Sequence, residues 1–165
     1  MKHFLKITLF FWIAISSAQT KLEMTPKGFA PIEIQIPNRP NNKLIEQSKA
    51  WASYYNVKAY DVFDVTENSI TIEALNENAC YYWNLGVKYN YDIKYILKIV
   101  FGENQKYTLT FTVKEIYTDA VPLKSTIADF FTAEGKLKED FTDVKPSLER
   151  TVNEIVKSYT RFIAQ

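Results

Sequence analysis

Two runs of alternating apolar and polar residues, separated by a short turn, constrain this fold more than any other feature. Within Tyr91–Phe101 every second residue is apolar, and Tyr107–Val113 repeats the alternation with threonines between its apolar positions. A period of two is that of a strand with one buried face, and Thr, Tyr, Val and Ile suit a pleated surface. Gly102-Glu-Asn-Gln supplies a turn with one residue that tolerates positive φ. The sequence therefore predicts a long antiparallel hairpin here.

Weaker signals upstream of the hairpin predict further elements. The alternation of Ile32–Ile36 predicts a short strand that stops at Pro37. A helix is expected after Asn41 or Asn42, either of which suits a cap, with Trp51 as its main anchor against a sheet. The remaining expectations are strands at Tyr60–Val65 and Ile70–Leu75, a loop at Asn76–Ala79 and an extended piece at Cys80–Gly86.

The end of the chain predicts an amphipathic helix of about five turns. Its apolar positions step by four and three residues from Leu148 to Phe162, Asp143 suits the cap and Pro146 fits the first turn. We expect the polar side to face solvent. That side consists of Glu149, Arg150, Asn153, Glu154 and Lys157.

The order of elements, β-α-β-β-β-β-α, predicts the fold class. Helices set against one side of an antiparallel sheet form an α+β domain of two layers, here with about five strands and two helices on one face. We assign this single domain to residues 32–165 and expect residues 19–31 to be an extended N-terminal segment. Residues 118–143 show no sustained period, and we expect apolar residues such as Ile127 and Phe130 to hold them against the body.

Residues 1–18 have the pattern of a secretory signal peptide: a basic start, an apolar run and a small-residue exit at Ala18. We therefore expect a soluble exported protein, periplasmic or extracellular. Cleavage removes Lys2 and Lys6, so that the 20 basic residues become 18 against 19 acidic residues. A slightly acidic chain has no broad attraction for nucleic acid, and we expect neither a nucleic-acid partner nor stable membrane insertion after cleavage.

The residue types that are missing exclude several chemistries. The only histidine, His3, lies in the leader, so the mature chain has no Ser-His-Asp or Cys-His pair and no imidazole metal ligand. Cys80 is the only cysteine, which we interpret as a small buried apolar residue. We therefore expect no catalytic residues, no metal and no cofactor, although a carboxylate-based enzyme stays open.

Aromatic residues form the one compositional excess, and they define the candidate binding surface. Exposed Tyr and Trp are favoured where proteins bind partners or stack on sugars. Tyr81 and Trp83 share one face of an extended segment while Tyr82 takes the other, so one layer cannot bury them all. Burial beneath residues 118–143 is the alternative. The candidate surface consists of Tyr81, Tyr82, Trp83, Tyr89 and Tyr91.

The pattern resembles a TBP-like-fold family of domains of unknown function in exported proteins of Bacteroidetes-type bacteria. The resemblance spans most of residues 30–163, although the family's usual Lys-Asp-Gly turn is replaced here by Gly102-Glu-Asn-Gln. It implies a fold and an exported setting, and it brings no catalytic motif. The matching pieces are Ile32-Glu-Ile-Gln-Ile-Pro, Ala50-Trp51, Ile93–Phe101 with Lys106-Tyr107, Ile127-Ala-Asp-Phe-Phe and Gly135-Lys-Leu-Lys.

Three functional hypotheses remain at this point. The first is a non-enzymatic binding or interaction module of the cell envelope, whose partner is an envelope protein or a glycan. The second is a hydrolase of envelope glycans that uses two carboxylates such as Asp61 and Glu73, which requires a cleft and one raised pKa. The third is a structural protein that pairs with a neighbour through an edge strand such as Ile32–Ile36.

Overall fold

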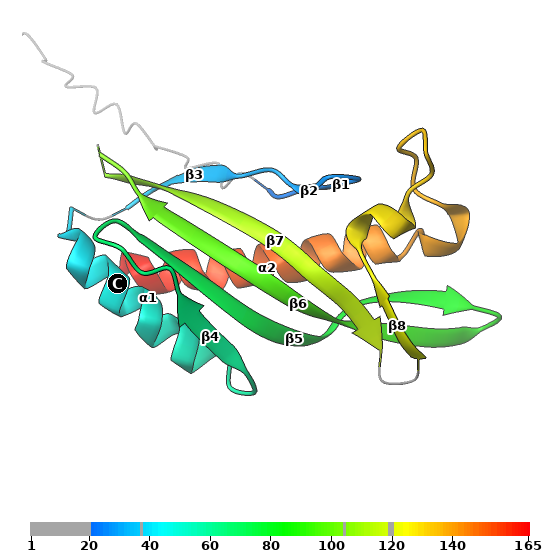
Figure 1. The fold of residues 1–165 in the computed structure, drawn as a ribbon. Helices are drawn as coiled ribbons and strands as arrows, with labels where there is room; N and C mark the ends of the chain where they lie inside the picture. The colour runs from blue at the N-terminus through cyan, green and yellow to red at the C-terminus, as the bar shows by residue number, and fades with distance from the viewer. Residues whose placement is uncertain (1–20, 37, 104, 119–120) are drawn as a thin grey trace, which may run out of the picture.

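The computed structural model describes residues 21–36, 38–103, 105–118 and 121–165. The leader predicted for residues 1–18 and its cleavage site lie outside these ranges. The described chain forms two layers, an antiparallel sheet and two helices (Figure 1).

The sheet has the strand order β3-β7-β6-β5-β4. A further strand, β8, pairs with the end of β7, so the sheet has six strands where about five were predicted. Both predicted arms of the long hairpin are present as β6 and β7, and every neighbouring pair is antiparallel. The bounds are β3 Ile32–Gln35, β4 Tyr60–Phe63, β5 Ser69–Asn84, β6 Val87–Phe101, β7 Lys106–Thr118 and β8 Val121–Ser125.

The period-two pattern of the sequence identifies the buried face correctly. In β6 the side chains predicted to face inward are fully buried from Ile93 to Phe101 at every second position, and Tyr107, Leu109 and Phe111 of β7 oppose them. A bulge in the β6–β7 ladder then adds one residue to β7, so that Ile116 faces the core. The core therefore lies between this face and the helices.

Helices α1 (Asn41–Tyr55) and α2 (Val144–Ala164) lie side by side on this face. Trp51 is buried as predicted, but it is anchored mainly to α2: its ring meets Tyr159 edge to face at 5.2 Å, and its Nε1 donates to the Ser158 Oγ at 3.2 Å. The predicted asparagine cap of α1 is wrong. The helix starts from Pro40, whose carbonyl oxygen accepts the first backbone hydrogen bonds.

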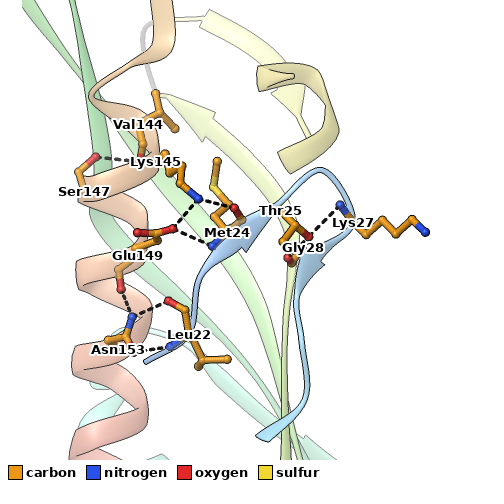
Figure 2. Close-up of polar contacts among 10 residues, drawn as sticks. All are labelled: Leu22, Met24, Thr25, Lys27, Gly28, Val144, Lys145, Ser147, Glu149 and Asn153. Atoms are coloured by element: carbon orange, nitrogen blue, oxygen red, sulfur yellow. Dashed lines mark hydrogen bonds and ion pairs between the residues drawn. The ribbon is translucent and has the colours of Figure 1, made fainter. Parts of the chain in front are cut away.

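The N-terminal segment corrects the prediction for two of the five residues on the polar side of α2, whereas Arg150, Glu154 and Lys157 are exposed as predicted. Residues 19–31 are extended where described, but they fold back into a hairpin of β1 (Met24–Thr25) and β2 (Gly28–Phe29). Glu149 is only 8% exposed, and its carboxylate accepts the backbone N–H of Met24 at 2.8 Å. Asn153 accepts the N–H of Leu22 and donates to its carbonyl, both at 2.9 Å (Figure 2). These two side chains bind the backbone of the N-terminal segment as a neighbouring strand would, so Glu149 is buried and Asn153 is only partly exposed.

Two segments predicted as loops contain regular structure. Asn76–Ala79 is a bulge inside β5, which makes Ile70–Leu75 and Cys80–Asn84 parts of one strand. Residues 118–143 contain β8 and two short 3-10 helices, η1 (Ile127–Phe130) and η2 (Glu139–Phe141). Ile127 and Phe130 are buried, which confirms that they hold this segment against the body.

Candidate functional site: the end of the β5–β6 hairpin

The five aromatic residues predicted as a binding surface lie together on one two-stranded ribbon. From Cys80↔Tyr91 to Asn84↔Val87, β5 and β6 pair with each other, whereas β7 pairs with β6 only from Asp92 onward. Among the described strands this ribbon therefore has no third partner. It projects beyond the rest of the sheet (Figure 1).

The bulge in β5 sets the direction of the ribbon, and α2 holds it. Asn78 adopts a positive φ of 53°, and its N–H donates to the Asp92 carboxylate at 2.7 Å. The carbonyl oxygen of Ala79 accepts the Thr151 hydroxyl at 2.6 Å, and the N–H of Tyr81 donates to Ser147 Oγ at 3.2 Å. Asn tolerates this backbone conformation, and side chains of α2 bind the backbone groups that the bulge leaves without a partner in the ladder. The ribbon therefore starts from a fixed base.

The inner face of the ribbon continues the core. Tyr82 stacks between the rings of Tyr89 and Tyr91, with centroids at 5.1 and 5.5 Å, and meets Phe141 of η2 at 5.5 Å. Tyr91 in turn meets Phe130 of η1 at 6.1 Å. Tyr82 and Tyr91 are half-buried, so the segment 118–143 covers part of the predicted surface, as the alternative interpretation expected.

The outer face and the tip remain open. Tyr81 is half-buried and carries the Lys88 ammonium 4.2 Å above its ring, a cation–π contact. Exposed apolar side chains gather at the end of the ribbon. They are Trp83 at 52%, Leu85 at 97%, Val87 at 52% and Tyr89 at 38%.

Leu85, Val87 and Lys88 are part of this tip and were not predicted. Leu85 and Gly86 have φ values of 47° and 79° between paired Asn84 and Val87, the geometry of a two-residue I′ turn. Such turns favour Asn-Gly or Asp-Gly, and Leu is disfavoured at a positive φ. The Leu85-Gly86 pair between two strand-like segments was the sequence signal that could have predicted this turn. Of the described non-glycine residues with positive φ, the other three are Asp64, Asn78 and Gln105.

Cys80 and Tyr91 of the ribbon are held in their neutral forms. Burial, followed by the nearby Asp92 charge, raises the pKa of the Cys80 thiol to about 12. Burial and the neighbouring Tyr82 raise the pKa of Tyr91 to about 12. A thiol with this pKa is not nucleophilic near neutral pH, because the thiolate is the reactive form. The ribbon therefore offers apolar contact surface and no activated nucleophile.

The carboxylates considered for hydrolysis lie elsewhere, where both line a pocket of about 250 Å³ together with Lys94. Asp61 of β4 and Glu73 of β5 are directly opposite each other in the ladder. Glu73 forms an ion pair with Lys94 at 2.6 Å, which raises the pKa of that ammonium. A neighbouring cation favours the charged carboxylate, whereas a general acid must be held protonated. In the described residues no three Asp, Glu, Cys or His side chains are grouped closely enough to hold a metal ion.

Strand β3 is an edge strand, as the third hypothesis requires, since β7 is its neighbour on one side and it ends the strand order. Within the described part of the chain, no helix is both long and apolar enough to span a membrane.

The strand order and the two helices on one face define a two-layer α+β domain. Its solved neighbours include a TBP-like protein from Parabacteroides distasonis, at 14% identity over 79% of this chain and 90% of that chain, with a TM-score of 0.48. A DUF4468 family protein from Bacteroides ovatus is similar at 10% identity over 81% of this chain and 80% of that chain, with a TM-score of 0.53. No family model and no curated protein sequence matches. The predicted resemblance is thus confirmed at the level of the fold.

Proposed function

We propose that this protein is an exported, non-enzymatic interaction module of the cell envelope and that it binds through the tip of the β5–β6 hairpin. One observation carries the proposal: Trp83, Leu85 and Val87 are exposed at the end of a ribbon whose base is fixed by α2. A rigid, exposed aromatic and apolar group loses little conformational entropy when it binds. Export follows from the leader pattern of residues 1–18.

Two sequence-based candidates receive less support. Glu73 is engaged in an ion pair with Lys94, so the pair Asp61–Glu73 does not offer the uncharged, apolar surroundings that a general acid needs. An edge strand such as β3 is common to open sheets and does not by itself indicate a partner. The apolar side chains exposed at the tip, by contrast, are not explained by folding alone.

The test is site-specific photo-crosslinking in cells that export the protein. A photoreactive residue replaces Leu85 at the tip, and a matched control replaces Val57, which is 87% exposed and lies between α1 and β4. We expect adducts with an envelope component at position 85 and none in common with position 57. Equal labelling from both positions, or no adduct at position 85, would contradict the proposed function.

A further inference from the structure

We infer that the hairpin tip docks reversibly on the interface of a lipid bilayer. This inference rests on the proposed function and specifies the partner of the same surface. The register shows that the side chains change from aliphatic at the turn to aromatic and basic further along the ribbon. Leu85 lies at the turn, Val87 follows beside Asn84, Trp83 pairs with Lys88, and the tyrosines come next.

That order matches the layers of a membrane surface. Apolar side chains enter the acyl boundary, Trp and Tyr rings sit at the level of the headgroups, and Lys extends its charge into the headgroup region. Lys88 is the only charged residue from Cys80 to Tyr91. Its positive charge suits anionic lipid, and no carboxylate of the ribbon has to be removed from water.

The size and shape of the tip favour lipid over a protein or a glycan. A specific protein interface takes about 800 Å² and 20–30 residues from each partner. The tip offers the seven residues Trp83–Tyr89 on a ribbon of two strands. A bilayer needs no matched pocket, since binding strength scales with the apolar area that enters it. Trp83 and Tyr89 lie at neighbouring register positions on opposite faces, so they form no flat platform for a sugar ring.

The turn supplies a second, independent observation. Leu85 occupies a backbone conformation that disfavours it and exposes 97% of its surface, so it contributes to folding neither locally nor by burial. An Asn at this position would relieve the backbone and remove the apolar group. Folding therefore favours Asn at this position, whereas lipid binding favours Leu. The substitution Leu85→Asn distinguishes an effect on binding from an effect on folding.

The experiment uses the chain from Gln19 onward, because the helices and strands described lie in residues 24–164 and the apolar leader would bind lipid by itself. Vesicles of phosphatidylcholine with one quarter phosphatidylglycerol are titrated while tryptophan emission is recorded. In this chain Trp51 is buried, so a blue shift reports Trp83. Leu85→Asn should weaken binding about tenfold or more, from the usual effect of burying a leucine.

Two further measurements decide the result. Val57→Asn should bind vesicles like the unmodified chain, and Leu85→Asn should melt no lower than the unmodified chain, which excludes misfolding as the cause. Equal losses in both variants, or no vesicle binding by the unmodified chain, would overturn the lipid inference. If vesicles do not bind but the tip still crosslinks to a protein in cells, the lipid inference fails and the proposed function stands. If neither occurs, both fail.

Discussion

Replacing Glu149 by Ala tests how the N-terminal hairpin is attached to α2. The carboxylate accepts the Met24 N–H at 2.8 Å and lies 2.9 Å from the Lys145 ammonium, which also donates to the Met24 carbonyl at 2.6 Å (Figure 2). The substitution removes a hydrogen bond to a charged group, worth about 1.5–3 kcal/mol, and leaves a buried N–H without its acceptor. The ion pair itself adds at most about 1 kcal/mol, since Lys145 is partly exposed.

The loss of about 2 kcal/mol or more should appear first as local opening of β1 and β2. Amide hydrogen exchange of Met24 is the direct assay, and its protection should fall about 30-fold, because 1.4 kcal/mol corresponds to a factor of ten. Glu149→Gln keeps an acceptor oxygen and should lose less. Glu154→Ala, at an exposed position of the same helix, is the matched control and should leave Met24 protected.

Unchanged Met24 protection in Glu149→Ala would refute the view that this side chain replaces a neighbouring strand. An equal effect of Glu154→Ala would refute it as well, because the loss would then belong to the charge of the helix and not to the contact.

Two further predictions concern the core. Trp51→Ala removes the ring between the helices and its hydrogen bond to Ser158, and should lower the free energy of unfolding in urea by about 3–5 kcal/mol. Stability should also fall at alkaline pH. Burial raises the pKa of Tyr107 from 10 to about 12, so the folded state keeps a proton that the unfolded chain loses. This stabilisation is complete below pH 10 and disappears toward pH 12, which lowers the free energy of unfolding by ~3 kcal/mol. Urea unfolding midpoints measured across this pH range report the loss, and Tyr107→Phe should reduce it. Midpoints that stay constant to pH 12 would contradict this reasoning.

The parts of the fold that the sequence predicted are those with a local period. Alternation in Tyr91–Phe101 and the helical spacing from Leu148 to Phe162 both depend on one buried face, which a single segment reveals by itself. Bulges are different, because the two residues that β5 gains between Asn76 and Cys80 interrupt the strand pattern, and this stretch resembles a loop until the partner strand is known.

Glu149 and Asn153 show why part of the polar face of α2 was interpreted wrongly. Their partners, Met24 and Leu22, lie more than 120 residues away in the chain. A charged residue at a polar helical position looks the same in the sequence whether water or a backbone N–H satisfies it. The candidate site was predicted in the same incomplete way: the aromatic excess indicated the ribbon, but only the register placed Leu85 at its end.

Helix α2 contacts both the N-terminal segment and the base of the ribbon. Ser147 and Thr151, one turn apart, contact the backbone of β5 at the base of the ribbon. Glu149 and Asn153, also one turn apart, contact the N-terminal segment. Each pair is offset from the other by two residues, about 200° around a helix of 3.6 residues per turn, so they point to opposite sides. The first half of α2 is thus held between the N-terminal segment and the base of the ribbon, and this support gives the exposed Leu85 a fixed direction away from the body.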